Sequence, residues 1–267
     1  MMERIVIVGS GHLAQALWEG WDRSRIESFV SIVARSVNHR HLWQSPIWEQ
    51  RVTFDPAAVG EADVIVLAVK PKDLDETWYA IAPYVRPRSL IISPVAGWSL
   101  SRIRSLGVNN PLVRIMPNVC AAVGASTTLA CFSDVSAPDV SLVMSLFSML
   151  GTVTVVKESV MDPYTALLGS GPAYIFLLLE ALIASGEQLG ADYGRTRQLV
   201  SEMVEGAARL ARDRSNDPLS EWISKVASPG GTTEALLDIL RQGGWPSMIQ
   251  DAVVKASERA QQLGKAR

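Results

Sequence analysis

The stretch Arg4-Ile5-Val6-Ile7-Val8-Gly9-Ser10-Gly11-His12-Leu13-Ala14 decides the fold of this chain. Its first half is apolar and β-branched, which predicts a short buried strand. Beyond the two glycines, Leu17, Trp18 and Trp21 recur at the spacing of one helix face. The stretch therefore predicts a strand, a tight turn and an amphipathic helix in immediate succession.

The turn in this stretch fits the pattern G-x-G-x-x-A, which is typical of dinucleotide-binding sites. The first glycine allows the tight turn, the second lets the backbone approach a pyrophosphate, and Ala14 keeps the helix close to the strand. The N–H groups at the start of the helix favour a bound anion. A cofactor site is therefore predicted at Gly9, Gly11, His12 and Leu13. An ordinary glycine turn is the alternative.

Strand-like runs recur through the first half of the chain and alternate with amphipathic or polar stretches. They cover residues 4–8, 29–33, 51–53, 64–69, 89–92, 112–115, 126–131 and 151–156. Such alternation predicts βαβ units on a mostly parallel sheet. From residue 158 onward the pattern is helical, without a convincing strand. We therefore predict an α/β chain: a Rossmann-type doubly wound domain over residues 1–157, followed by an all-α domain over residues 158–267.

One long helix is predicted from Pro163 to Gly190, and its middle, residues 173–179, is apolar on every side. Such a helix must be buried all round. Because about a hundred helical residues can hardly bury it alone, we expect a homodimer or a multiple of dimers built on this domain. The nearly apolar stretch from residue 173 to residue 184 is too short to cross a bilayer of about 30 Å, so no membrane is expected.

The composition argues for a small-molecule partner. The chain has 25 Lys and Arg against 27 Asp and Glu, a net charge of -2 that offers no field for nucleic acid or an anionic membrane. The N-terminus lacks the features of a signal peptide, which predicts a cytoplasmic protein with Cys120 and Cys131 as free thiols. The histidines, His12, His39 and His41, lack cysteine partners at zinc-ligand spacing, so no metal is expected.

The end of the second strand indicates which dinucleotide is bound. An NAD site usually has an acidic residue there, which hydrogen-bonds the ribose 2′-hydroxyl. This chain instead has Arg35 and Ser36, which suit a 2′-phosphate. The sequence therefore favours NADP, with NAD as the alternative cofactor. The competing interpretation is that residues 35–41 form a basic loop that only faces solvent.

Two further loops are expected to border the cofactor, because ligands of open α/β sheets lie beyond the carboxyl ends of the strands. The first loop follows the fourth strand and contains Ala68, Val69, Lys70 and Pro71. The second follows the sixth strand and contains Asn118, whose side chain can both donate to and accept from a carboxamide such as that of nicotinamide. For Lys70, an ordinary loop charge is an equal alternative.

Several motifs occur in a fixed order along the chain. They are the Gly9 turn, Val69-Lys70-Pro71, Ala96-Gly97, Met116-Pro117-Asn118, Gly169-Ser170-Gly171-Pro172-Ala173-Tyr174 and Ser228-Pro229-Gly230-Gly231-Thr232-Thr233. The set, which covers nearly the whole chain, resembles the pyrroline-5-carboxylate reductases. Ser-Pro-Gly-Gly-Thr-Thr is its most specific element. The resemblance adds Ala96 and Gly97 to the expected cofactor site.

The last of these motifs also has a physical interpretation. Glycines before a helix expose successive N–H groups, and the helix N-terminus adds positive potential, so Gly230 and Gly231 can form a carboxylate cradle. Plain helix capping by Thr232 and Thr233 is the alternative. The resemblance implies hydride transfer from NAD(P)H to 1-pyrroline-5-carboxylate, giving L-proline. It places the substrate carboxylate at Gly230, Gly231 and Thr232, and it places Thr165 and Thr233 by the ring, where either could relay a proton.

Some positions depart from the family pattern: His12 stands where Asn is common, Val119-Cys120 replaces Thr-Pro, Trp98 follows Ala96-Gly97, and Leu168 replaces a small polar residue. These departures motivate an alternative, a regulatory protein of the late-competence type that keeps cofactor binding without catalysis. The intact Gly230 loop opposes it. A β-hydroxyacid dehydrogenase is a second alternative, but it needs an interdomain lysine, and this chain has none between Lys157 and Lys225.

Overall fold

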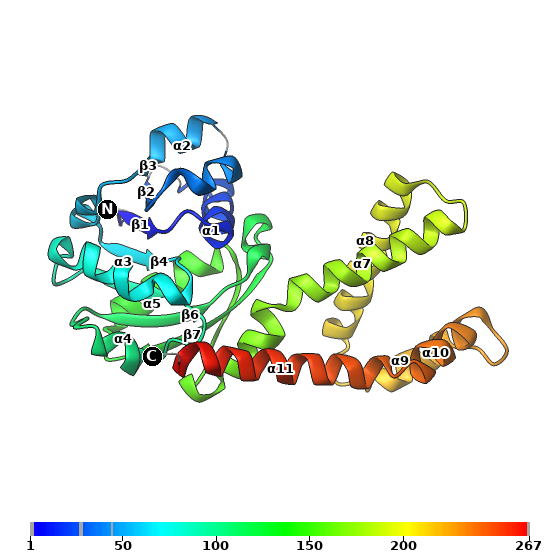
Figure 1. Ribbon diagram of the computed structural model, residues 1–267. Coiled ribbons are helices and arrows are strands. Elements are labelled where there is room, and N and C mark those ends of the chain that lie inside the picture. The colour runs from blue at the N-terminus through cyan, green and yellow to red at the C-terminus, as the bar shows by residue number, and fades with distance from the viewer. Residues whose placement is uncertain (1–2, 27–28, 44, 266–267) are drawn as a thin grey trace. The chain divides into compact units, whose positions relative to one another are not determined.

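The computed structural model describes residues 3–26, 29–43 and 45–265, and its first part is built on one eight-stranded sheet (Figure 1). The strand order is β3-β2-β1-β4-β5-β6-β7-β8, and every pairing is parallel except that of β6 with β7. The strands are β1 (Ile5–Val8), β2 (Val30–Val33), β3 (Val52–Thr53), β4 (Val64–Leu67), β5 (Leu90–Ser93), β6 (Leu112–Met116), β7 (Ser126–Ser133) and β8 (Gly151–Val155). All eight strand-like runs of the sequence are confirmed.

Strand β1 lies at the point where the strand order reverses. It pairs with β2 on one side and β4 on the other, so Ile5 is opposite both Val30 and Val64. In a doubly wound sheet, ligands bind at the carboxyl ends of the strands beside such a switch point. The glycine turn that follows β1 is therefore at the position where a dinucleotide would bind.

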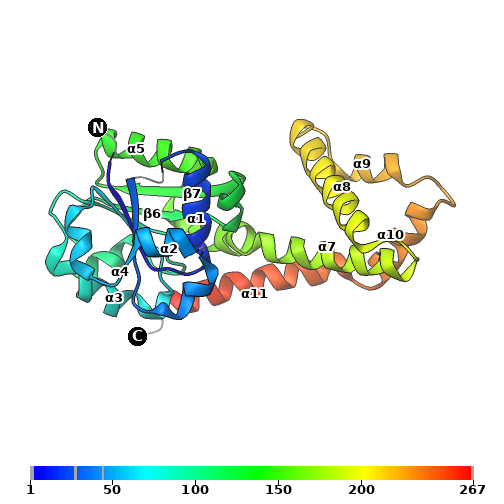
Figure 2. The same ribbon diagram turned by 90° about the horizontal axis from the view of Figure 1, so that it is seen from above.

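Helices cover both faces of the sheet (Figures 1 and 2). One face packs against α1 (His12–Arg23), α2 (Ser45–Arg51) and α5 (Ala137–Ser148), and the other against α3 (Leu74–Ile81) and α4 (Leu100–Ser105). The side chains of β1 alternate between the two cores, as the period of a strand requires. Trp21 of α1 is fully buried, and its indole N–H donates to the Leu146 carbonyl of α5 at 3.0 Å.

The C-terminal part is helical, with no strand in the described residues beyond β8. Its elements are α6 (Met161–Tyr164), a π-helical turn (Thr165–Gly169), α7 (Gly171–Gln188), α8 (Tyr193–Asp213), α9 (Leu219–Val226), α10 (Thr232–Gln242) and α11 (Trp245–Lys265). The one long helix predicted over residues 163–190 is interrupted near its start. There the Ser170 N–H reaches back five residues to the Thr165 carbonyl at 3.1 Å, which widens the turn.

The chain forms two compact units, residues 1–172 with 255–267, and residues 173–254. Arg114 of β6 explains why residues 158–172 belong to the first unit. Its buried guanidinium pairs with Glu158 at 3.3 Å and also with Asp162, which ties the start of the helical region to the sheet. The end of α11 is tied to α4, because Arg102 donates to the Leu263 carbonyl at 3.2 Å.

The second unit has almost no core of its own. Within residues 173–254, all of which the structure describes, Ile183 is the one buried hydrophobic residue, whereas Phe176, Leu177 and Ile239 are more than half exposed. The helical run Glu158–Gln188, longer than the apolar stretch judged from sequence, is long and apolar enough to cross a membrane by length and composition. A helix that is covered by other protein passes the same test. Exposed apolar surface of this extent marks an interaction surface.

Substitution of Gly9 by alanine should destabilise the first unit strongly. Gly9 has φ +117°, and an added Cβ would lie 2.2 Å from the Ala68 carbonyl oxygen. Gly107→Ala is the matched control, because Gly107 also has positive φ, +85°, but has nothing within 4 Å of an added Cβ. We expect the control to lose about 1–2 kcal/mol from strain alone and Gly9→Ala to lose clearly more, measured by urea unfolding. Equal losses would contradict the close approach of β1 and β4.

Candidate cofactor and substrate sites

The glycine turn has the geometry of an anion site. The Gly9 N–H donates to the Val33 carbonyl at 2.8 Å, which holds the turn against β2. Gly11 is the N-cap of α1 without a side-chain hydrogen bond, and the first turn of the helix has no acidic residue. The N–H groups of such a first turn lack intrahelical partners and remain available to a pyrophosphate. A Cβ on Gly11 would meet only His39, at 3.9 Å, so the backbone here can be approached closely.

The other two residues predicted at this turn occupy the first turn of α1. His12 is exposed and Leu13 is half-buried. Both residues contribute backbone N–H groups at the helix N-terminus. The structure thus brings the glycines, His12 and Leu13 together at the carboxyl end of β1.

Arg35 and Ser36 lie just beyond the end of β2, the strand that pairs with β1. The exposed Arg35 guanidinium pairs with Glu76 at 2.9 Å and with Asp73 at 3.4 Å, both from the segment after β4. The Ser36 hydroxyl accepts from the Asn38 N–H at 3.4 Å and caps a 3₁₀ turn. Exposed ion pairs stabilise by only about 0–1 kcal/mol, so a phosphate dianion could replace these carboxylates at little cost. The residues present therefore fit a 2′-phosphate.

The loops after β4 and β5 lie side by side because their strands are paired in parallel. Lys70 is exposed and precedes a short 3₁₀ turn that begins at Pro71. Gly97 has φ +75°, and the next residue, Trp98, donates its indole N–H to the Pro71 carbonyl at 3.1 Å. The predicted residues Ala68, Val69, Lys70 and Pro71 therefore share one edge of the sheet with Ala96 and Gly97.

Asn118 acts as a clamp between three segments. It is buried after β6, and its backbone N–H donates to the Ser126 hydroxyl at 3.1 Å. Its side-chain oxygen accepts from the Cys120 N–H at 3.0 Å, and its side-chain NH₂ donates to the Leu168 carbonyl at 3.1 Å. Each half of the amide thus has one internal partner. One donor and one acceptor position remain for a ligand, because an amide offers two of each.

Thr165 begins the π-helical turn that Asn118 holds. Its side chain is buried, and its hydroxyl donates to the Met161 carbonyl at 2.7 Å. The hydroxyl oxygen can still accept a hydrogen bond, but to donate a proton to a substrate it must first release Met161. Turns of this kind are frequent at functional sites.

The Gly230 loop belongs to the second unit and precedes α10. Gly230 has φ +72°, and Gly231 is the N-cap of the helix without a side-chain hydrogen bond. The Gly230 N–H donates to the carboxylate of Glu234 at 2.7 Å. The expected carboxylate cradle therefore already holds a carboxylate from its own helix. The contact resembles a capping box but lies one residue before the N-cap. The hydroxyls of Thr232 and Thr233 lie in the first turn of the same helix.

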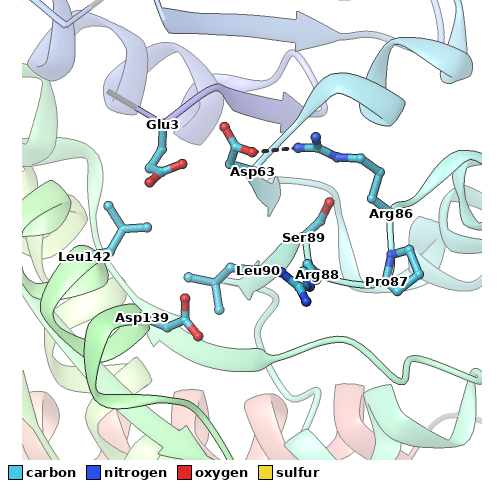
Figure 3. A pocket seen from close by; sticks show the side chains of 9 residues that line it. All are labelled: Glu3, Asp63, Arg86, Pro87, Arg88, Ser89, Leu90, Asp139 and Leu142. Carbon is cyan, nitrogen blue, oxygen red and sulfur yellow. Dashed lines mark hydrogen bonds and ion pairs between the residues drawn. The ribbon is translucent and has the colours of Figure 1, made fainter. Parts of the chain in front are cut away.

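A surface pocket of about 530 Å³ lies at the opposite, amino-terminal edge of the sheet and contains none of the predicted site residues (Figure 3). Glu3, Arg86 and Asp139 contribute to its lining. Asp63 pairs with Arg86 at 2.6 Å. Partial burial and the neighbouring Asp63 raise the pKa of Glu3. Because Arg86 is already paired with Asp63 and acidic groups cluster beside it, we assign no ligand to this pocket.

Sequence reasoning missed the side chains that hold the loops in place. Trp43 donates its indole N–H to the Ser10 carbonyl at 3.0 Å, Trp98 holds Pro71, and Arg114 anchors the helical region. Their partners lie 27 to 48 residues away along the chain, so no local pattern marks them. The one available signal was the abundance of tryptophan, with eight in the chain.

Comparisons with known families agree with this arrangement. The model described as "NADP oxidoreductase coenzyme F420-dependent" matches residues 4–97, and the model described as "Pyrroline-5-carboxylate reductase dimerisation" matches residues 158–263. Fold and comparisons together define an NADP-dependent oxidoreductase with a Rossmann-type domain. Pyrroline-5-carboxylate reductases of Methanosarcina acetivorans and Synechocystis are 33% and 34% identical to this chain. The alignments cover 98% of both chains in the first case, and 99% of this chain and 100% of the relative in the second. The chain belongs to the pyrroline-5-carboxylate reductase family.

Solved structures support the same assignment. The pyrroline carboxylate reductase of Plasmodium falciparum, crystallised with NADP bound, superposes with a TM-score of 0.89 at 26% identity, covering 98% of each chain. The reductase of Coxiella burnetii superposes with a TM-score of 0.80 at 30% identity over the full length of both chains.

Proposed function

We propose that this protein reduces 1-pyrroline-5-carboxylate to L-proline with NADPH, the last step of proline biosynthesis. The full-length similarity to reductases of that name, with the Gly-Gly-Thr-Thr loop intact at the start of α10, carries the proposal. Residues 1–157 bind the cofactor in this proposal, and residues 158–267 bind the substrate and form the dimer.

The reaction requires little acid–base catalysis from the protein. Bound NADPH supplies a hydride to C5 of the cyclic imine, a carbon that is already electrophilic and more so when the ring nitrogen is protonated. The chain has to align the ring with the nicotinamide and exclude water. The glycine turn, the loops after β4 and β5, and Asn118 bind the cofactor in this scheme. Asn118 offers its remaining donor and acceptor positions to the carboxamide.

The substrate carboxylate binds to the N–H groups of Gly230 and Gly231 and to Thr232 in this proposal. Glu234 bears on this step, because its carboxylate already accepts from the Gly230 N–H at 2.7 Å. Two carboxylates cannot share that donor without repulsion, so the substrate must displace the Glu234 side chain. Since this side chain is exposed, it can move into solvent at small cost.

Thr165 and Thr233 are the candidates for delivering a proton to the ring nitrogen. The Thr165 hydroxyl is committed to the Met161 carbonyl, whereas Thr233 lies at a helix start beside the proposed carboxylate site. This favours Thr233 as the proton relay: its hydroxyl passes its proton to the ring nitrogen and takes one from water, with Thr165 as an acceptor that orients the protonated nitrogen.

Turnover is tested by following NADPH oxidation with 1-pyrroline-5-carboxylate. The wild-type chain should be active, and Thr233→Val should reduce kcat/KM at least about tenfold, because a hydrogen bond to a charged group is lost. Thr154→Val, on the exposed face of the edge strand β8, is the control and should behave as wild type. A wild-type chain that binds NADPH tightly but never turns over would contradict the proposal and favour a regulatory role.

Arg35 and Ser36 bind the 2′-phosphate in this proposal, so the enzyme should prefer NADPH over NADH by at least about tenfold, or about 1.4 kcal/mol. Arg35→Met should abolish the preference, because Asp73 and Glu76 would then repel the phosphate without compensation. Steady-state kinetics with NADPH and NADH measure this preference as the ratio of the two kcat/KM values. Arg88→Met, at the opposite edge of the sheet (Figure 3), should leave the preference unchanged. Equal use of both cofactors by the wild type would refute the assignment.

The exposed apolar surface of the second unit is covered by a second copy of the chain in this proposal, which makes the protein a homodimer or a multiple of dimers. Its long apolar helix then faces protein rather than lipid, as in a soluble, cytoplasmic enzyme. Light scattering should give at least twice the chain mass of 29.0 kDa.

Substitution tests which surface forms this dimer. Phe176→Lys, on α7, should shift the protein toward monomers, because it places a charge in the apolar interface. Tyr79→Lys, on the similarly exposed surface of α3, should not. A wild-type mass of one chain at working concentration would rule the dimer out.

A further inference from the structure

The carbonyl oxygen of Ser10, between the two glycines of the turn, has a partner far away in the sequence. The indole N–H of Trp43 donates to it at 3.0 Å. Trp43 is 5% exposed, and its ring packs edge-on against Trp18 of α1, with centroids 6.4 Å apart. The hydrogen bond is thus shielded from water. The ring packs against α1, the helix that follows the glycine turn.

This hydrogen bond fixes the direction of a neighbouring N–H group. A peptide unit is planar and trans, so its C=O and N–H groups point in opposite directions. When Trp43 holds the Ser10 carbonyl on one side, the Gly11 N–H must face the other side. Gly11 is the uncapped N-cap of α1, so its N–H is one of the groups expected to bind a pyrophosphate.

The segment before Trp43 lies against the same turn. It is the 3₁₀ turn Val37–Leu42, and the Nδ1 atom of its His39 lies 3.5 Å from the Ser10 hydroxyl. This segment directly follows Arg35 and Ser36, which we assign to the 2′-phosphate. The chain from β2 to Trp43 therefore connects the adenosine side of the cofactor site with its pyrophosphate side.

We propose that Trp43 is a positioning residue for the cofactor: its indole N–H holds the Ser10–Gly11 peptide so that the Gly11 N–H faces the pyrophosphate. This inference rests on the proposed function and adds a residue outside the glycine motif. It predicts that loss of the indole N–H alone weakens cofactor binding through the pyrophosphate.

Trp43→Phe removes the N–H group and keeps an aromatic ring. Trp78→Phe is the matched control, because the Trp78 indole also donates to a backbone carbonyl, that of Leu106 at 3.1 Å, and is 3% exposed. Both variants should lose similar stability in urea unfolding. Only Trp43→Phe should raise the Kd for NADPH, about fivefold to tenfold by titration calorimetry, the effect of one buried hydrogen bond. Its KM for NADPH should rise in parallel.

Adenosine 2′-monophosphate is the second probe, because it carries the 2′-phosphate but no pyrophosphate. Its Kd should be the same for the wild type and Trp43→Phe. If Trp43→Phe lost affinity equally for both ligands, the inference would be overturned, since the whole segment from Arg35 to Trp43 would then have moved. An unchanged Kd for NADPH in Trp43→Phe, or the same change in Trp78→Phe, would overturn it as well.

A second variant and the choice of measurement distinguish a folding defect from a failure of the inference, and a failure of the inference from a failure of the proposed function. Should phenylalanine at position 43 prevent folding, benzothienylalanine, an isostere of tryptophan that lacks the N–H, replaces it in the same comparison. Kd values are measured without the imine, so a wild type that binds NADPH but fails to reduce the imine would contradict the proposed function and leave the inference on Trp43 to its own test.

Discussion

The close passage of the chain at Gly9 is the constraint on which the rest of the first unit depends. An added Cβ there would overlap the Ala68 carbonyl, so the chain after β1 can pass this close to the chain after β4 only because residue 9 has no side chain. The same residue bends the chain from β1 into α1 with a backbone conformation that favours glycine. It thereby brings the N-terminus of α1 to the switch point of the sheet. The loops after β2, β4 and β5 begin at the same edge. The place of the glycine turn in the cofactor site depends on this one steric condition.

At three of the positions that depart from the family pattern, the contacts are made by the backbone, whereas at a fourth, Trp98, the indole side chain donates to the Pro71 carbonyl. Leu168 contributes its carbonyl oxygen to Asn118, and Cys120 contributes its N–H group to the same side chain. His12 is exposed, and what it offers an anion is an N–H at the start of α1. Val119 is exposed and leaves the Asn118 clamp intact. Any residue supplies the carbonyl at position 168 and the N–H at position 12, so these two substitutions are compatible with a working reductase. The N–H at position 120 is different, because the proline usual there in the family has none, so this hydrogen bond to Asn118 depends on the departure.

The two units differ in how they are stabilised. The first buries both faces of its sheet beneath helices and needs no partner for its core. The second, residues 173–254, leaves most of its apolar side chains exposed, so its helices gain little from burial within one chain. In the proposed dimer the missing burial comes from a second copy.

The sequence by itself determined the strands, their order and the change to a helical pattern after the last strand. Periodicity placed all eight strands, and the glycine spacing placed the turn at the end of β1, because both signals arise from residues close together in the chain. Only the tertiary structure decided how the loops are held. Trp43 meets Ser10, Asn118 meets Leu168, and Arg35 meets Glu76 across separations of 33, 50 and 41 residues. Such contacts exist only after the sheet has brought distant segments together, so no local pattern of residues could have revealed them.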